Sequence, residues 1–159
     1  MNKFILLIII PLLSLALIGC NDENDEIKPM DLRPFAGAWE VVDQGNQVLL
    51  ERGCIVDITS SQIFEGYGGY QGYFTTYSIS DDGVATHDRV FTWSIREVEN
   101  HRPLLDVVYQ GELDSDDPWA GNYQYKIIKL TDSEMSWQVN TIGDHSVIKF
   151  IRRNDIQIE

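Results

Sequence analysis

The feature of this sequence that most constrains its fold is an alternation of apolar and polar side chains at every second residue. It is clearest in segment 90–98, where Phe91, Trp93 and Ile95 alternate with polar residues. Successive side chains of a β-strand point to opposite faces of a sheet, so this pattern is typical of a strand with one buried face. The same period recurs along the chain, whereas a helical period does not. The sequence therefore predicts an all-β fold.

Ten segments carry the strand pattern, and residues that favour tight turns separate them. Asp81-Asp82-Gly83, Thr131-Asp132-Ser133 and Ile142-Gly143-Asp144 all contain Asp, and the first and last also contain Gly; both residues tolerate the left-handed conformations of antiparallel connections. Two segments are expected to be halves of one bent strand, which gives about eight to ten antiparallel strands. Many short strands without intervening helices indicate a sandwich or a closed barrel. The segments are 37–43, 47–58, 62–66, 72–79, 84–87, 90–98, 104–111, 123–130, 134–140 and 146–152.

The N-terminus begins with an apolar run, 4–18, that follows Lys3 and contains no ionisable side chain. The run is shorter than the roughly 20 residues that a helix needs to cross a bilayer. A short apolar run behind a basic residue is typical of a signal peptide. A signal peptide is therefore favoured over a permanent transmembrane span.

The end of this run, Leu17-Ile18-Gly19-Cys20, resembles the lipobox of bacterial lipoproteins. The resemblance implies that residues 1–19 are removed and that Cys20 receives a diacylglycerol and a further acyl chain. Two or three acyl chains hold a protein on a membrane almost permanently. The mature protein is then anchored to the membrane through Cys20. The alternative is an ordinary cleaved signal peptide followed by a cysteine by chance.

Residues 20–31 are expected to form an acidic tether between the lipid and the folded part. The segment 21–26 is polar and strongly charged and has almost nothing apolar to bury, which favours disorder. Its acidic cluster beside Cys20 resembles the surface-export signal of Bacteroidetes lipoproteins. The resemblance implies a lipid-anchored protein of the outer membrane that faces outward. A plain spacer that faces the periplasm is the alternative.

The charge of the mature chain excludes one class of partner. One of the 12 basic residues, Lys3, lies in the signal peptide, which leaves 11 against 25 acidic residues and a net charge near −14. Such a surface repels phosphate backbones, so we expect no nucleic-acid partner. The remaining chain, 32–159, has the length of one domain.

Two short motifs in this domain resemble the lipocalin-like domains of Bacteroidetes lipoproteins. Gly37-Ala38-Trp39 opens the first expected strand, and the late segments 125–135 and 150–152 are similar to the closing strands of that family. The resemblance implies a small antiparallel up-and-down β-barrel over 32–159. It also implies that Trp39 closes one end of the barrel and that Arg152 or Arg153 lies across its indole, a cation–π contact.

Aromatic residues give two candidate sites. If the barrel is hollow, Tyr77, Phe91, Trp93 and Trp137 line a ligand cavity; if it is solid, they fill the core. In the glycine-rich segment 66–73, Tyr67 and Tyr70 are candidates for stacking on a sugar ring or on a partner protein, because a phenol combines apolar area with a polar tip. The alternative for this segment is a hairpin connection with bulges.

Reactive and metal-binding residues lack supporting motifs. Cys54 has no partner for a disulfide once Cys20 carries lipid, and it is interpreted as a small buried hydrophobe rather than a nucleophile. The acidic segment 114–119 offers carboxylates for calcium but lacks the rest of an EF-hand pattern. The histidines share no metal-ligand spacing, so no metal or cofactor is predicted; they are His87, His101 and His145.

Three functional hypotheses follow from these features. The first is a lipid-anchored lipocalin-like protein that binds a small apolar or glycan ligand at the cell envelope. The second is a non-catalytic interaction module with a solid core, an accessory subunit of an outer-membrane complex. The third, a hydrolase built from dispersed acids, has no motif in its favour, so no catalytic residue is predicted and the chain is expected not to be an enzyme.

Overall fold

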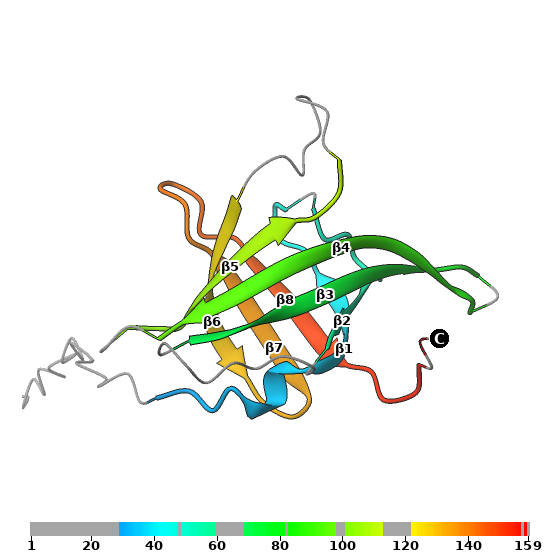
Figure 1. Cartoon of the computed structure of the whole chain (residues 1–159), viewed down its shortest axis with the longest axis horizontal. Helices are drawn as coiled ribbons and strands as arrows, with labels where there is room; N and C mark the ends of the chain where they lie inside the picture. The colour runs from blue at the N-terminus through cyan, green and yellow to red at the C-terminus, as the bar shows by residue number, and fades with distance from the viewer. Residues whose placement is uncertain are drawn as a thin grey trace, which may run out of the picture.

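The computed structural model describes residues 29–47, 49–59, 69–81, 83–97, 101–112, 122–156 and 158. These residues form one short 3-10 helix and eight strands (Figure 1). The elements are η1 (Arg33–Phe35), β1 (Gly37–Asp43), β2 (Ile55–Ile58), β3 (Gly69–Ile79), β4 (Ala85–Arg96), β5 (Leu104–Tyr109), β6 (Asn122–Leu130), β7 (Glu134–Val139) and β8 (Val147–Arg152).

The strands form a closed barrel in sequence order, and every neighbouring pair is antiparallel. The closing pair is β1 with β8, in which Trp39 lies opposite Arg152. An up-and-down order of this kind lets each strand pair with the next through a short connection. The all-β prediction and the antiparallel barrel of eight strands are therefore confirmed.

The barrel has two distinct ends. At one, here called the η1 end, η1 leads into β1, and the β4–β5 and β6–β7 connections turn the chain. At the other, here called the far end, lie the β1–β2, β3–β4, β5–β6 and β7–β8 connections. In Figure 1 the paired ends of β3 and β4 project past the other strands at the far end.

Two details of the strand prediction change. The expected strand over 47–58 is a strand only at Ile55–Ile58, because a turn at 51–54 precedes it, in which the Cys54 amide donates to the Glu51 carbonyl and Gly53 has a φ of 87°. The expected segments 84–87 and 90–98 belong to one strand, β4, which is bulged at Asp88. The expected strand over 62–66 lies outside the described residues.

Buried side chains of all eight strands meet inside the barrel. The alternation in β4 places Phe91, Trp93 and Ile95 inward, each no more than 4% exposed. Residues outside the strands also enter this core: Leu32 and Phe35 come from the η1 end, and Leu49 and Leu50 from the β1–β2 connection at the far end. The core is therefore closed by apolar side chains at both ends.

Candidate functional site

The interior aromatics of the described strands pack against one another. Phe91 stacks on Phe74 with ring centroids 4.8 Å apart. Trp137 meets Phe150 at 4.5 Å, and Phe35 meets Trp93 edge-on at 5.0 Å. Three of the four residues expected to line a ligand cavity, Phe91, Trp93 and Trp137, therefore fill the core.

The fourth residue, Tyr77, lies on the outer face of β3. Phe74 and Thr76 of the same strand point inward and are buried, so Tyr73, Thr75 and Tyr77 point outward. Tyr73 is 48% exposed, and the Tyr77 ring meets the exposed His87 edge-on at 5.9 Å. The expectation that Tyr77 lines the interior is wrong, because the buried face of β3 is the one that carries Phe74 and Thr76, and Tyr77 lies on the other face.

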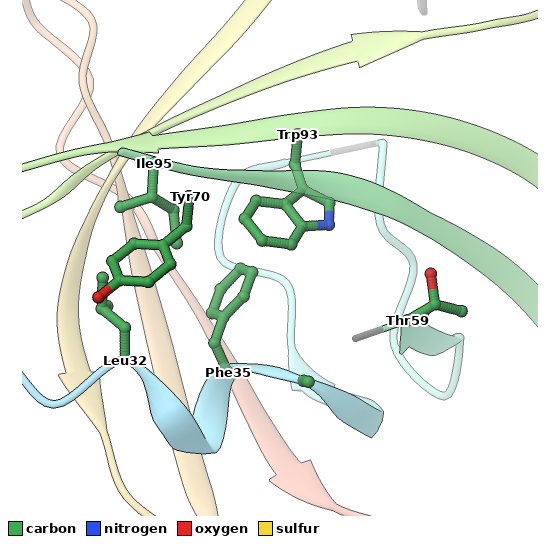
Figure 2. Close-up of a pocket in the computed structure, with 7 residues that line it drawn as sticks. Leu32, Phe35, Thr59, Tyr70, Trp93 and Ile95 are labelled. Atoms are coloured by element: carbon green, nitrogen blue, oxygen red, sulfur yellow. The ribbon is translucent and has the colours of Figure 1, made fainter. Parts of the chain in front are cut away.

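A small apolar pocket lies at the η1 end (Figure 2). Its volume is about 10 Å³, which is at the lower limit for one water molecule. The indole Nε1 of Trp93, which is buried, has no hydrogen-bond partner among the described residues. The lining residues are Leu32, Phe35, Ala36, Thr59, Tyr70, Trp93 and Ile95. The pocket is too small for an organic ligand.

Tyr70, expected on a surface loop, is part of β3 and packs against the core. Its ring borders the small pocket in Figure 2. It is therefore half-buried and not freely exposed for stacking. Tyr67, its expected partner in surface binding, lies outside the described residues.

Trp39 and Arg152 meet at the η1 end. The guanidinium carbon of Arg152 lies 4.0 Å from the centroid of the Trp39 ring. Burial lowers the pKa of Arg152, but a guanidinium stays protonated in proteins. Arg153, the other arginine considered, points elsewhere and pairs with Glu40 and Asp155.

A polar pocket of about 270 Å³ lies at the far end. The β1–β2 connection contributes Gln47, and the β7–β8 connection contributes Thr141 and Asp144. The start of β6 supplies the remaining polar and aromatic side chains. Among the described residues, the lining is Gln47, Asn122, Tyr123, Gln124, Tyr125, Val139, Thr141 and Asp144. This volume is only slightly below the roughly 300–1,000 Å³ of pockets for drug-sized ligands.

Hydrogen bonds hold the polar lining of this far-end pocket in place. The Gln47 Nε2 donates to Asp144 Oδ2 at 3.2 Å, and the Ser146 amide donates to Asp144 Oδ1 at 2.8 Å. Gln124 donates to Asp106 at 2.8 Å and accepts from the Asn140 side chain. These bonds join the β1–β2 connection to the β7–β8 connection, and β6 to β5 and to the start of the β7–β8 connection.

The ionisable groups of the pocket have defined charge. Hydrogen bonds from Ser146 lower the pKa of Asp144, so its carboxylate is charged at neutral pH. Burial raises the pKa of Tyr125, so its phenol stays neutral. Tyr123 lies two residues earlier on the same face of β6 and is partly buried. The lining thus offers one anion, the neutral amide of Gln47, hydroxyls and aromatic rings.

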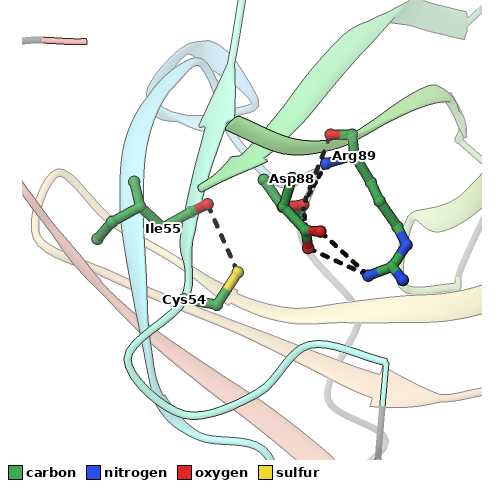
Figure 3. A network of polar contacts seen from close by, with 5 residues as sticks. Cys54, Ile55, Asp88 and Arg89 are labelled. Carbon is green, nitrogen blue, oxygen red and sulfur yellow. Dashed lines mark hydrogen bonds and ion pairs between the residues drawn. The ribbon is translucent and has the colours of Figure 1, made fainter. Parts of the chain in front are cut away.

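Cys54 is a free, half-buried thiol next to β2 (Figure 3). Its sulfur is directed to the carbonyl oxygen of Ile55 at 3.5 Å. Burial, with a smaller effect of the nearby Asp88 carboxylate, raises the pKa of the thiol to about 12. The thiol is therefore protonated at neutral pH, which does not suit a nucleophile.

Within the described ranges, no group of three or more His, Cys, Asp or Glu residues is placed to hold a metal ion. The described chain also has no helix of the length and apolarity needed to cross a membrane. Segment 114–119, considered for calcium, lies outside the described residues, as does Cys20.

The far-end pocket was missed at the sequence level. Its lining comes from position 47, from 122–125 and from 139–144, and nothing in the linear pattern links these segments. The sequence predicted a turn at Ile142-Gly143-Asp144, but nothing in it indicated that this turn forms one wall of a pocket.

The fold and the pocket define an eight-stranded up-and-down barrel with a filled core and a polar depression at one end. No family model and no curated protein matches the chain. A solved structure that matches is a lipocalin-like protein from Bacteroides uniformis, with a TM-score of 0.46 and 13% sequence identity. The match covers 76% of this chain and 99% of that chain.

Proposed function

We propose that this protein is a lipid-anchored, non-catalytic envelope protein that binds a small saccharide at the far end of its barrel. One observation carries the proposal: the barrel interior is filled, whereas a polar pocket of about 270 Å³ lies at the far end. Of the two kinds of ligand expected, a small apolar molecule requires interior space that the core does not leave. A glycan requires the polar surface that the pocket provides.

The chemistry of the lining matches a saccharide. A sugar hydroxyl is both donor and acceptor, and the side-chain amide of Gln47 in the pocket lining also offers both. The ring of Tyr123 offers apolar area for the C–H face of a sugar, with a hydroxyl at its edge. The Asp144 carboxylate accepts from hydroxyl donors, and charge-assisted hydrogen bonds are stronger than neutral ones.

The proposed binding can be tested by ligand-observed NMR with methyl glycosides of glucose, galactose and mannose and with N-acetylglucosamine. We expect saturation transfer from the protein to at least one sugar. The variant Thr141→Trp places an indole at the exposed rim of the pocket and should abolish the transfer. The matched control is Ser133→Trp in the exposed β6–β7 turn at the η1 end, which should bind as the wild type does.

Two outcomes would refute saccharide binding at this site. One is the absence of transfer to every sugar in the series. The other is transfer that survives in Thr141→Trp, provided that its thermal unfolding resembles that of the wild type. Retained binding in that variant would place any sugar elsewhere on the chain.

The anchor belongs to the same proposal. It is supported by the lipobox-like Leu17-Ile18-Gly19-Cys20 and the acidic tether that follows. In cells fed a labelled fatty acid, the wild-type protein should become labelled. The Cys20→Ala variant should carry no label and should no longer be recovered in the membrane fraction. Protease treatment of intact cells tests the outward orientation, because a periplasmic domain would be protected.

A second candidate function is a protein-interaction module in an outer-membrane complex. The filled core favours it, and so does the projecting β3–β4 hairpin (Figure 1), in which Val84 is 57% exposed. A photo-crosslinking residue at position 84 would capture a partner in native membranes. The same residue at position 142, which is also an exposed apolar site, is the control for non-specific capture.

A further inference from the structure

We propose that the far-end pocket selects its ligand by charge: it takes neutral sugars and rejects those that carry a carboxylate or sulfate, and Asp144 sets this preference. The inference rests on the proposed saccharide binding and specifies the class of sugar. Asp144 is the one carboxylate among the lining residues that the structure describes, and these residues include no Lys or Arg.

The position of the Asp144 carboxylate is fixed by its partners. Its Oδ1 accepts from the Ser146 amide at 2.8 Å, and its Oδ2 accepts from Gln47 Nε2 at 3.2 Å. The backbone amide of Asp144 also donates to the carbonyl of Thr141 at 3.1 Å. A negative charge that is held in the wall cannot swing away from an incoming anion.

Nearby cations at the far end do not offset this charge. Lys149 binds Asp43 at 2.9 Å, and Arg89 binds Asp88 at 3.1 Å. Arg52 is exposed and does not line the pocket. His145, next to Asp144 in the chain, is also exposed and outside the lining, although its protonated form attracts the Asp144 carboxylate. An anionic sugar therefore meets repulsion without a compensating ion pair.

The size of the discrimination follows from Coulomb's law. Two like charges a few ångströms apart near a protein surface repel each other, and the repulsion grows as the effective dielectric falls. We expect a uronic acid to bind about fivefold or more weakly than its parent hexose, which corresponds to about 1 kcal/mol. Added salt should reduce the difference, because mobile ions screen charges at the surface.

Three variants isolate the role of Asp144. Asp144→Asn removes the charge but keeps one oxygen for the Ser146 amide, and the Gln47 amide can turn over to accept from the new Asn. Asp81→Asn is the matched control, because it removes the same charge from the exposed β3–β4 turn outside the pocket lining. Gln47→Lys places a cation beside Asp144 and should shift the preference toward acidic sugars.

The experiment is calorimetric titration at about pH 8, above the range in which an ordinary imidazole titrates. The probes are the methyl glycosides of glucose, galactose and mannose and the methyl glycosides of the matching glucuronic, galacturonic and mannuronic acids. In the wild type and in Asp81→Asn, the best neutral sugar should bind about fivefold or more tightly than its acid. In Asp144→Asn the two should bind within about twofold of each other.

The outcomes separate this inference from the proposed function. Equal or tighter binding of the acid by the wild type overturns charge selection while leaving saccharide binding intact. Charge selection by Asp144 is also overturned if Asp81→Asn loses the preference for the neutral sugar to the same extent as Asp144→Asn. Should Asp144→Asn fail to fold, an unchanged preference in folded Gln47→Lys overturns the inference by itself. If no sugar of either series binds the wild type, both the proposed function and the inference fall.

Discussion

Arg152 and Trp39 face each other across the β1–β8 pair that closes the barrel, with 4.0 Å between the guanidinium carbon and the indole centroid. The guanidinium also donates to the carbonyls of Pro34, Ala36 and Asp132, and the Trp39 Nε1 donates to the Phe35 carbonyl at 3.0 Å. One cation thus ties η1 and the β6–β7 turn to the last strand.

Arg152→Ala should lower the free energy of unfolding by about 2–3 kcal/mol, because it removes a cation–π contact and several charge-assisted hydrogen bonds. Urea unfolding followed by tryptophan fluorescence measures this loss. Arg153→Ala is the matched control: its pair with Asp155 lies at the surface and its pair with Glu40 is half-buried, so the loss should be smaller, about 1 kcal/mol. Equal losses in the two variants would contradict the role assigned to Arg152.

Gly72→Ala should destabilise the barrel by about 1–3 kcal/mol, because added atoms in a packed core force neighbouring side chains out of place. A Cβ at Gly72 would lie 2.9 Å from Cζ2 of Trp93, and the buried indole has little room to move. Thermal unfolding measures the effect. Gln71 is the exposed neighbour of Gly72, and Gln71→Ala serves as the control. This variant should unfold at nearly the wild-type temperature.

Phe35→Ala should cost about 3–5 kcal/mol and leave a cavity at the η1 end. Phe35 is 3% exposed and lies against Trp93 and Trp137. An apolar cavity of this kind can bind benzene, so benzene should raise the unfolding temperature of the variant. It should leave the wild type unchanged. Stabilisation of the wild type by benzene would contradict a filled barrel interior, because it would require space for benzene that the packed core does not leave.

Cys54 should make the protein sensitive to alkali. The folded state raises the pKa of the thiol from 9.0 to about 12, so the folded chain keeps the proton while the unfolded chain loses it. The stabilisation is complete below pH 9 and is lost as the pH rises toward 12. Above pH 9, stability should fall by about 1 kcal/mol per pH unit more in the wild type than in Cys54→Ala. Urea unfolding at a series of pH values tests this, and parallel slopes would contradict it.

Strand alternation predicted the barrel well where one face of a strand is polar. In β4, Phe91, Trp93 and Ile95 are buried as the pattern indicates. In β3 both faces carry aromatic residues, so the pattern identified a strand but not its buried face, and Tyr77 was placed inside when Phe74 is the inward residue. Alternation gives the period of a strand, and only packing partners decide its phase.

Burial outside the strands could not be read from the pattern. Leu49 and Leu50 are buried from a connection, although apolar residues beside Ile55 suggested a longer strand. The far-end pocket had still less signal, because Gln47 and Asp144 are neighbours only through closure of the barrel. The sequence does not distinguish a polar connection residue that is isolated in solvent from one that lines a pocket with other polar residues.

Residue 29 leads into η1, and the polar pocket occupies the opposite pole of the barrel. An attachment ahead of residue 29, such as the lipid proposed at Cys20, would therefore enter the barrel at the pole that does not carry the pocket mouth. The two sites do not compete for the same end of the barrel.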